Sequence, residues 1–600
     1  MVLFIFAIAL FFRAAFFWDY KNTAAFPLMP YSDSDFYYQR ANEIAAGDIF
    51  NSKAFMRWPV YAYLLAILFK LSATNIVFVY WLQFLLGACG CLFLYFVAKI
   101  LFNESVGFIA ALFYAWYGLF VFYEGLLLYV TVSLFLNLLF FLTLLRLKDK
   151  LNNRNLFGSG VFLGICTITQ GNILFLGVPS IIWILWQAGL KFRKLISYFL
   201  CFILGLGLIL AALLLRSYIV EKDLVLFTGN TGVNFYIGNN PQAGGVLTWP
   251  KELSGTSEGM LKDARVIAKI NTGRELKSSE VSRFWMNKAA DFIKKSPGDY
   301  LKLLSKKVVA LFSPQEWVYE PEYYPVFAKV RIFKIMFLDL TFILPLAFLG
   351  MLLNLKNLKQ TALLYLAVIT LSAGIILFFV QAKFRVMLAP FFMLFAASAA
   401  YSLWDLIRRR KAAQFISLLL ILLLFFTLSK RQGMNLAAAK QEQGNMTEFR
   451  YHFSKAIGHE QNLDYQSALD ELILAERIRP DNHNIFFSFG SIYYYLNRFN
   501  EAEAKFKQAI SVSPFFTDAY YNLGFLYNQM QRFDEAIAVL KRAVFLEPDD
   551  IAAHFELAKA YKAKGMFKES GGEFEFILKK TKNQPANQAA VKKELLDLDR

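Results

Sequence analysis

Two carboxylates separated by one residue open the stretch of this sequence that is best suited to chemistry. The run Tyr31-Ser-Asp33-Ser-Asp35-Phe-Tyr37 follows closely on the first long apolar segment. A carboxylate at a membrane surface can act as the general base that takes a proton from an acceptor hydroxyl. Asp33, with Asp35 as the alternative, is therefore the candidate base, and Tyr37 a candidate contact for the substrate. The competing interpretation is that Asp33 or the next serine caps a helix running from Asp35 to about Ala46.

A third candidate catalytic carboxylate is Glu124, which lies between two apolar segments in Phe122-Tyr-Glu124-Gly125. A charge at a membrane edge is costly to bury, so it is a functional candidate by default. We expect it to position a substrate, or a divalent ion if one is used. Alternatively, it is a loop carboxylate that reaches water.

Three basic residues are candidate contacts for a lipid phosphate, because guanidinium and ammonium groups bind phosphate oxygens. Arg57 precedes the apolar stretch 59–72, which is too short to span a bilayer and suits an interfacial helix. Lys307 lies on an amphipathic helix that Pro297 begins. Arg385 follows Lys383 at the outer mouth of a late apolar segment. For each of them the alternative is a solvated or snorkelling cation.

Amide and aromatic side chains gather in the run from Thr228 to Pro241. Such side chains suit sugar hydroxyls and ring faces, which makes Asn234, Tyr236, Asn239 and Asn240 candidate sugar or acceptor contacts. Gly and Asn at this density also form tight turns, so a plain turn-rich loop is the alternative.

Long apolar segments must position these residues. Hydrophobic residues make up 57% of the 600 residues and charged ones only 18%, which disfavours an ordinary soluble fold. A spanning helix needs about 20 apolar residues, and residues 1 to about 430 supply about eleven such segments. Nine lie near 1–18, 76–98, 106–122, 125–145, 196–218, 332–353, 361–380, 386–406 and 412–429, and the stretch 157–188 supplies two short ones. The stretch 157–188 is divided by a turn near Gln170-Gly171-Asn172. The first segment lacks the basic start and cleavage site of a signal peptide.

The distribution of basic residues predicts which side of the membrane each loop faces. The net charge is +18, yet the basic residues cluster in short loops, as orientation signals do in membranes, and this argues against a nucleic-acid binder. The clusters around Arg146–Arg154, Lys191–Lys194 and Arg408–Lys411 then fall on the cytoplasmic side. The predicted outer face holds the segment 19–75, the segment 219–331 and the C-terminal tail.

The tail repeats with a period of 34 residues, marked by Pro480, Pro514 and Pro548. This is the period of tetratricopeptide (TPR) repeats, in which helix pairs stack because one unit cannot bury its apolar face alone. We expect about four repeats over 449–584, a linker over 431–448 and a capping helix over 585–600. The repeats indicate a binding scaffold and name no partner.

Several kinds of site are absent from the sequence. Its four cysteines lie in apolar segments and its four histidines in the tail, so no zinc site or disulfide framework is predicted. No Walker loop or Gly-x-Ser-x-Gly elbow is present either. A sugar donor reached from outside the membrane should then be lipid-linked. No cofactor is predicted with certainty, and a divalent ion stays compatible with the carboxylates.

These pieces in this order resemble the GT-C glycosyltransferases, in particular glycosyltransferase family 39, over residues 1 to about 405. The pattern Asp33-x-x-x-Tyr37-x-x-x-Ala41 is similar to the family's catalytic motif after the first helix. The runs around Pro59-Val-Tyr61, Phe235 to Pro241 and Phe384 to Pro390 resemble its later motifs. Where relatives often have Arg-Pro, this chain has Gln170-Gly171, which implies that a phosphate or carboxylate contact is lost. The fused repeats resemble those of the transmembrane-and-TPR O-mannosyltransferases.

The resemblance implies an all-α polytopic membrane protein, with residues 1–430 as a GT-C-like domain, a mixed outer loop region at 219–331 and a C-terminal α-solenoid. It implies an inner-membrane enzyme that transfers a sugar from a polyprenyl-phosphate donor to an acceptor hydroxyl of a protein or an envelope glycan, with the TPR domain on the periplasmic side. The rival functions are en bloc oligosaccharide transfer, for which a Trp-Trp-Asp signature is missing, and a membrane-anchored TPR scaffold.

Overall fold

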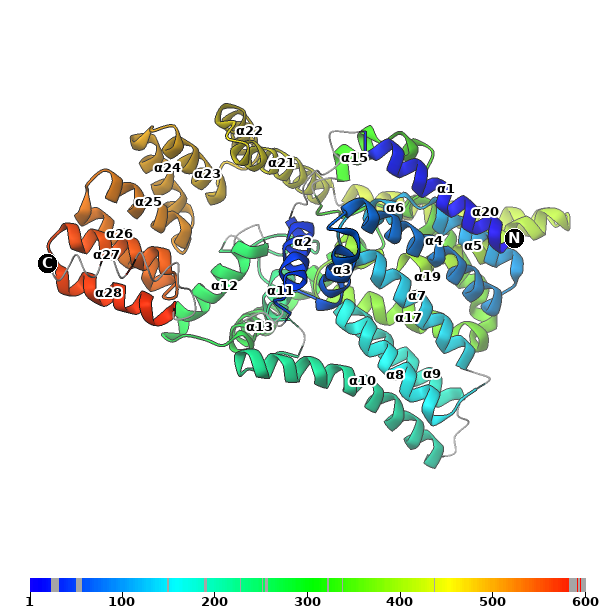
Figure 1. Cartoon of the computed structure of the whole chain (residues 1–600). Helices are drawn as coiled ribbons and strands as arrows, with labels where there is room; N and C mark the ends of the chain where they lie inside the picture. The colour runs from blue at the N-terminus through cyan, green and yellow to red at the C-terminus, as the bar shows by residue number, and fades with distance from the viewer. Residues whose placement is uncertain are drawn as a thin grey trace. The chain divides into compact units, whose positions relative to one another are not determined.

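The computed structural model describes residues 1–22, 32–49, 57–147, 150–187, 192–226, 228–250, 252–253, 257–320, 323–336, 338–435, 437–581, 591 and 594. Within these residues the elements are helices, and two isolated β-bridges are the only extended pairings. The chain divides into two compact units (Figure 1). One comprises Met1–Pro250 with Leu276–Gln443, and the other comprises Lys251–Glu275 with Gly444–Arg600.

Each of the predicted apolar segments of the membrane unit contains a helix. These helices are α1 (Val2–Tyr20), α4 (Ile76–Leu101), α5 (Glu104–Trp116), α7 (Val130–Leu147), α8 (Asn153–Thr169), α9 (Gly177–Gln187), α10 (Phe192–Glu221), α16 (Leu340–Asn354), α17 (Leu358–Leu377), α19 (Ala389–Arg408) and α20 (Ala412–Asn435). Among the described residues, six spans are long and apolar enough to cross a bilayer by length and composition, and α16 with α17 together count as one of them. The protein is a multi-pass membrane protein of all-α fold.

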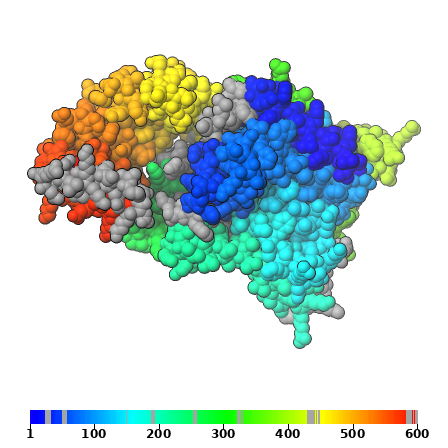
Figure 2. All heavy atoms as spheres, in the orientation of Figure 1, coloured from blue at the N-terminus to red at the C-terminus, as the bar shows by residue number. Residues whose placement is uncertain are grey.

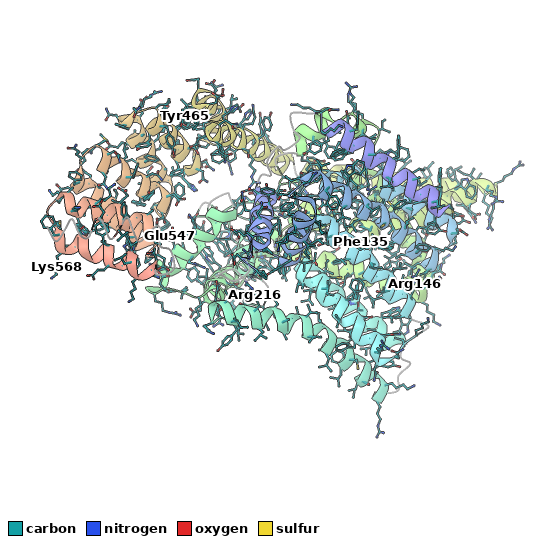
Figure 3. All side chains as sticks on the ribbon, viewed as in Figure 1. Phe135, Arg146, Arg216, Tyr465, Glu547 and Lys568 are labelled. Atoms are coloured by element: carbon teal, nitrogen blue, oxygen red, sulfur yellow. The ribbon has the colours of Figure 1, made fainter. Side chains whose placement is uncertain are left out.

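The helices of the membrane unit pack as layers around α4, α7 and α19. Figure 3 labels Phe135 and Arg146 on α7, and the ring of Phe135 packs 5.1 Å from that of Phe93 on α4. On α19 every residue from Ala389 to Ala399 is buried. The helices at the periphery instead expose apolar side chains. In Figure 2, α1 (dark blue) lies on the surface of this unit, and its Phe4 and Trp18 are 56% and 67% exposed. Such exposure suits helices that face lipid.

The stretch 157–188 is broken where the sequence predicts it. Helix α8 ends at Thr169, Gln170 is extended, and a 3₁₀ helix, η1 (Gly171–Leu176), leads into α9. Helix α10 packs against both α8 and α9. The prediction of two short helices with a turn near Gln170 is therefore confirmed.

Three of the helices outside the spans carry or directly follow candidate residues of the first outer segment and the large loop. They are α2 (Ser32–Ala45), α3 (Pro59–Ser72) and α14 (Pro297–Leu311). Helix α2 begins before Asp33, so Asp33 lies inside the first turn and the capping interpretation is wrong. The packed face of α14 carries Leu303, Lys307 and Ala310, while Leu301 on another side is 66% exposed.

The outer loop region is less mixed than predicted. Besides α14, it forms α11 (Thr231–Gly238), α12 (Ser257–Thr272), α13 (Ser278–Lys295) and α15 (Tyr323–Lys329). The Val246↔Val380 bridge is its only extended pairing in the described part. Turns connect these helices. Helix α11 lies within the Thr228–Pro241 run and ends at Gly238.

The TPR unit consists of helices that stack in pairs. They are α21 (Ala437–Gln461), α22 (Tyr465–Ile478), α23 (His483–Tyr495), α24 (Phe499–Val512), α25 (Thr517–Gln529), α26 (Phe533–Leu546), α27 (Ile551–Ala563) and α28 (Phe567–Lys580). Within two pairs the small residue of one helix meets a large one of the next: Gly490 lies against Phe506 and Gly524 against Leu540. The four predicted repeats correspond to these pairs. The predicted capping helix lies almost entirely outside the described residues.

Helix α12 of the outer loop belongs to the TPR unit. Lys262 Nζ lies 3.4 Å from Asp518 Oδ1 of α25, and Lys269 Nζ donates to the carbonyl of Phe545 in α26 at 2.9 Å. Residues on both sides of α12 along the chain belong to the membrane unit. The loop that links α11 to α13 therefore contributes one of its helices to the TPR unit.

Candidate active site

Asp33 is held by two cations from distant parts of the chain. Arg57 Nη1 lies 2.6 Å from Asp33 Oδ1, and Lys383 Nζ lies 2.9 Å from Asp33 Oδ2. All three side chains are largely buried, with exposed fractions of 11% to 15%. The first turn of α2 also favours a carboxylate, because the helix N-terminus carries partial positive charge. The result is a single carboxylate between a guanidinium and an ammonium group.

The electrostatics of Asp33 follow from this geometry. Burial would raise the pKa of Asp33, but Arg57 and then Lys383 outweigh it and hold that pKa well below its usual range. Burial would lower the pKa of Lys383, yet Asp33 and Glu320 raise it on balance. Asp33 and Lys383 are therefore both charged at neutral pH, and together with Arg57 they carry one more positive than negative charge.

Arg57 is positioned by α3 and by an aromatic ring. It lies two residues before Pro59, which begins α3, and α3 packs directly against α2. Its guanidinium carbon lies 4.5 Å from the centre of the Phe36 ring, an arrangement that favours a fixed cation. The sequence proposed Asp33 and Arg57 separately, and the structure brings them together.

Lys383 is the cation that the sequence analysis did not select. It lies in the short helix α18 (Ala382–Arg385), two residues before Arg385. These two side chains leave α18 in different directions, so Lys383 reaches Asp33 while Arg385 does not. The sequence signal was the Lys383-Phe-Arg385 run itself, but nothing in the sequence says which of the two cations meets a carboxylate 350 residues away.

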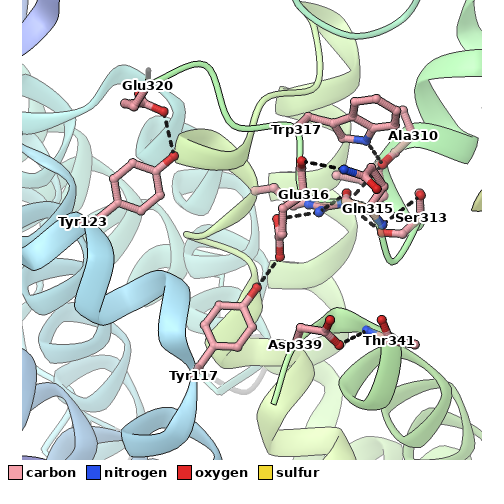
Figure 4. Close-up of polar contacts among 12 residues, drawn as sticks. Tyr117, Tyr123, Ala310, Ser313, Gln315, Glu316, Trp317, Glu320, Asp339 and Thr341 are labelled. Atoms are coloured by element: carbon pink, nitrogen blue, oxygen red, sulfur yellow. Dashed lines mark hydrogen bonds and ion pairs between the residues drawn. The ribbon is translucent and has the colours of Figure 1, made fainter. Parts of the chain in front are cut away.

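Arg385 organises a loop. Its guanidinium lies 2.5 Å from Glu316 and donates to the backbone carbonyls of Ala310 and Ser313 at 3.2 and 2.8 Å. Glu316 also accepts a hydrogen bond from Tyr117 at 2.5 Å (Figure 4). Most of the donors of this arginine are used within the protein. The arrangement favours a positioning role for Arg385 over the phosphate contact that the sequence suggested.

The loop that Arg385 organises carries a second buried carboxylate, Glu320. It accepts a hydrogen bond from the hydroxyl of Tyr123 at 3.2 Å (Figure 4), and another from the backbone N–H of Tyr319 at 3.2 Å. Burial raises the pKa of Glu320; Lys383 opposes this, and Asp33 adds to it. Glu320 therefore belongs to the same electrostatic cluster. Sequence reasoning missed it because a single glutamate in a loop carries no motif.

Glu124 is engaged elsewhere. Its two carboxylate oxygens accept from Arg13 Nε and Nη2 of α1 at 2.6 and 2.7 Å, and both side chains are buried. Gly87 of α4 leaves room for the pair, because an added Cβ there would lie 2.0 Å from Glu124 Oε1. A carboxylate with both oxygens bound to one guanidinium serves the packing of α1 on its neighbours. The alternative of a loop carboxylate in water is wrong, and the geometry does not favour the catalytic role.

Asp35 lies on α2 but faces away from the two cations. It accepts a hydrogen bond from Gln39 Nε2 at 3.3 Å on the exposed side of the helix. Successive residues of a helix are 100° apart, so residues two apart leave it on nearly opposite sides. Of the two neighbouring carboxylates, Asp33 is the one that the fold places among charged partners.

The asparagine-rich run mainly builds turns. Asn239 Nδ2 donates to the carbonyls of Phe235 and Leu377, and Asn240 Nδ2 donates to those of Tyr236 and Ile237. The Tyr236 ring is buried 4.8 Å from that of Trp285. Asn234 is half-buried on α11. The geometry therefore favours turn formation for most of this set, and Asn234 is the member whose side chain stays accessible.

Lys307 is buried beside the same run. Its Nζ donates to Asn239 Oδ1 at 2.8 Å, and burial lowers the pKa of Lys307 to about 7. A neutral amide is a weak partner for a buried ammonium group. Lys307 therefore stays a candidate anion contact, separate from the cluster around Asp33.

No metal site stands out. Among the described residues, no group of three or more His, Cys, Asp or Glu side chains is arranged to hold an ion. The chemistry of the cluster is that of one carboxylate base with two cations, which suits a hydroxyl nucleophile and an anionic leaving group.

Two family models match the chain. The model for dolichyl-phosphate-mannose-protein mannosyltransferases matches residues 56–214, and a tetratricopeptide-repeat model matches residues 493–554. No curated protein sequence matches the chain.

Among solved structures, the apo form of the oligosaccharyltransferase of Archaeoglobus fulgidus is similar over 72% of this chain and 56% of that one, with 14% identity and a TM-score of 0.41. This chain thus spans about half the length of that enzyme. The TPR protein YrrB is similar over 25% of this chain and 79% of its own, with 20% identity and a TM-score of 0.22. MamA is similar over 31% of this chain and 93% of its own, with 19% identity and the same score. The matches thus indicate a membrane domain similar to dolichyl-phosphate-mannose-protein mannosyltransferases over residues 56–214, followed by C-terminal tetratricopeptide repeats.

Proposed function

We propose that this protein transfers a sugar from a polyprenyl-phosphate donor to an acceptor hydroxyl on the outer face of the membrane. The observation that carries the proposal is the buried Asp33 between Arg57 and Lys383. A general base and phosphate-binding cations are the two parts that this reaction needs, and the fold brings them to one place. The family match to residues 56–214 supports the same reaction class.

The resting geometry suggests how the base becomes active. While both cations contact Asp33, its pKa is far below the usual range, and it is a poor base. A donor phosphate competes for the same two cations, because phosphate oxygens bind guanidinium and ammonium groups as carboxylates do. As Arg57 and Lys383 turn to the phosphate, Asp33 loses their stabilisation and its proton affinity rises. Donor binding thereby converts a paired carboxylate into a base.

The transfer then follows as one displacement. Asp33 takes the proton of the acceptor hydroxyl, and the acceptor oxygen forms a bond to the anomeric carbon. The bond from that carbon to the phosphate oxygen breaks with inversion, and the polyprenyl phosphate leaves with the bonding electrons. Arg57 and Lys383 stabilise the charge that develops on it. Phosphate is a good leaving group, so no strong general acid is required.

The TPR unit is proposed to select a protein acceptor. Its repeats form a binding scaffold, and α12 joins it to the outer loop through Lys262 and Lys269. A helix of the loop thus lies within the repeat unit, and the chain on both sides of it belongs to the catalytic unit. This division leaves the chemistry to the membrane unit and the choice of acceptor to the repeats.

Membranes that contain the protein test the reaction directly. They are incubated with polyprenyl phosphates that carry a radiolabelled single sugar, and with a lipid-linked oligosaccharide as the comparison. Transfer of the label from a monosaccharide donor to protein or glycan, absent from membranes without the protein, is the expected result. Transfer from the oligosaccharide donor alone would identify an en bloc transferase. Absence of transfer from both donors by folded protein, with natural membranes as the acceptor, would favour a scaffold.

A further inference from the structure

Four buried polar side chains near Asp33 have polar atoms without a hydrogen-bond partner in the part of the chain that the structure describes. They are Tyr37 with its hydroxyl, Ser133 with its hydroxyl, Asn137 with both amide atoms and Gln170 with both amide atoms. Each is at most 1% exposed. We call these four side chains the inner polar group.

Unpaired polar atoms at this depth are costly. A buried donor or acceptor without a partner costs about 1–3 kcal/mol, and proteins satisfy the great majority of such atoms. The same fold shows the usual outcome at Asn354, whose Nδ2 donates to the Gly350 carbonyl and the Ser398 hydroxyl at 2.7 and 2.9 Å. Two amides with no partner at all therefore indicate a ligand that supplies one.

The register of α7 against α8 brings three members of the group together. Phe140 and Phe162 rings lie 5.7 Å apart, and Cys166 Sγ lies 3.8 Å from the Leu136 carbonyl. These pairs show that the helices run antiparallel. About one turn further in each helix, Gln170 comes level with Ser133.

Asn137 lies about one turn from Ser133 on the same face of α7, because residues four apart share a face. Phe141 continues this face, and its ring packs 5.0 Å from that of Phe391 on α19. The face that carries Ser133 and Asn137 is therefore turned toward the interior of the membrane unit rather than toward lipid.

The inner polar group adjoins the catalytic cluster through two aromatic contacts. Tyr37 follows Asp33 by one turn of α2, and its ring lies 6.1 Å from that of Tyr129, whose carbonyl accepts from the Ser133 N–H. At the other side, Gly171 lies against Trp58, since an added Cβ would be 2.3 Å from that indole ring. Trp58 directly follows Arg57. The group thus lies behind Asp33 and Arg57, on the interior side.

The break of the helix at Gln170 fits a binding role. Gln170 lies at the turn between α8 and η1, and its side chain is nevertheless buried. Here the chain leaves the helix at Gln170, which is extended with φ −156° and ψ 115°. A side chain at the end of an interrupted helix can reach a ligand that a continuous helix would exclude.

We propose that the inner polar group binds the sugar ring of the donor and restricts it to uncharged sugars. Amides and hydroxyls both donate and accept, as sugar hydroxyls do. The group contains no ionisable carboxylate or amine, so an ammonium or carboxylate on the sugar would be buried without an opposite charge. With the donor phosphate on Arg57 and Lys383, the sugar extends inward onto Tyr37, Ser133, Asn137 and Gln170. The inference rests on the proposed function.

The test compares two kinds of buried amide. Asn137→Leu and Gln170→Met remove unpaired amides, whereas the control Asn354→Leu removes a paired one. In detergent and without a donor lipid, purified Asn137→Leu and Gln170→Met are expected to melt at or above the melting temperature of the wild type. Asn354→Leu is expected to melt below it. Melting of Asn137→Leu and Gln170→Met as low as that of the control would overturn the proposal, because the amides would then be structural.

Binding supplies the second arm. The probes are polyprenyl phosphate, polyprenyl phosphate mannose, polyprenyl phosphate glucose and polyprenyl phosphate aminoarabinose. The wild type is expected to bind at least one neutral-sugar lipid more tightly than the sugar-free lipid, and the aminoarabinose lipid no more tightly. Each amide variant should weaken binding of that neutral-sugar lipid about 5- to 30-fold and leave the sugar-free lipid unchanged.

Different results would overturn the sugar-binding inference and the proposed transferase function. Variants that keep the full preference for the neutral-sugar lipid, or a wild type that prefers the aminoarabinose lipid, would overturn the inference and leave the proposed function standing. A wild type that binds none of the four lipids would overturn the proposed function and the inference with it.

Discussion

Arg13 and Glu124 offer a quantitative test of the distinction between structural and catalytic charges. Arg13 lies in α1 with its side chain fully buried, and Glu124 at the end of α6 (Gly118–Glu124) is 3% exposed. The pair shares two hydrogen bonds of 2.6 and 2.7 Å, and Arg13 also donates to the Ala9 carbonyl. The perturbation is to remove the charges singly and together, in Glu124→Gln, Arg13→Met and Arg13→Met/Glu124→Leu.

The burial of both side chains sets the expected changes in the free energy of unfolding. Removing one partner of a buried pair leaves the other charge uncompensated and costs about 3–5 kcal/mol. Replacing both by apolar side chains of similar volume is often neutral or stabilising, because the desolvation cost of both charges disappears. Each single variant should therefore be strongly destabilised, and the double variant should lie within about 1–2 kcal/mol of the wild type.

Thermal unfolding of the purified variants in detergent measures the stability, and transfer from a lipid-linked sugar measures the activity. The double variant is expected to melt near the wild type and to keep most of the transfer rate. A double variant that is folded and inactive would refute the structural role and restore Glu124 as a catalytic carboxylate. Near-wild-type stability of both single variants would refute the buried pair itself.

Three further predictions concern the cations, the topology and the repeats. Lys383→Gln removes one of the two cations that hold the pKa of Asp33 below its usual range, so this pKa rises and the acid limb of the kcat/KM profile should move to higher pH. An unmoved acid limb would show that Lys383 does not act on the base. A cysteine at Gln531 should react with a membrane-impermeant thiol reagent in intact spheroplasts, and labelling only after lysis would place the repeats inside. Truncation after about residue 435 should preserve transfer to a simple acceptor and lower glycosylation of the natural one. Loss of turnover with every acceptor by a folded truncation would contradict that division.

The membrane helices were predictable because each depends on local composition. The apolar segments, the break at Gln170 and the 34-residue repeat are all visible in short windows of sequence, and all appear in the structure. Asp33 and Arg57 were found in the same way, since a carboxylate and an arginine near a membrane helix are recognisable without knowing their partners.

The partners of these residues were not predictable. Lys383 reaches Asp33 and Arg13 reaches Glu124 only after helices far apart in sequence have packed. The choice between Lys383 and Arg385 depends on the direction in which each leaves α18, which the two-residue spacing does not reveal. Asn239 and Asn240 looked like sugar contacts by residue type, yet their amides hold the turn after α11.

On α14, the partner of an apolar helix face was likewise not predictable from the sequence. The apolar side chains of Leu301 and Val308 are exposed, and the protein packs on the side of α14 that carries Leu303 and Lys307. A stripe can meet lipid as well as protein, and periodicity does not distinguish them in a membrane protein.

The most direct test of the central claim is the transfer rate of Asp33→Asn beside that of Asp35→Asn. Asparagine keeps the size and much of the hydrogen bonding of aspartate but cannot take the proton. Asp33→Asn is expected to fold, to bind the lipid-linked donor and to transfer sugar about 10²–10⁴-fold more slowly than the wild type, while Asp35→Asn retains most of the rate. Near-normal transfer by Asp33→Asn would show that the general base is another group.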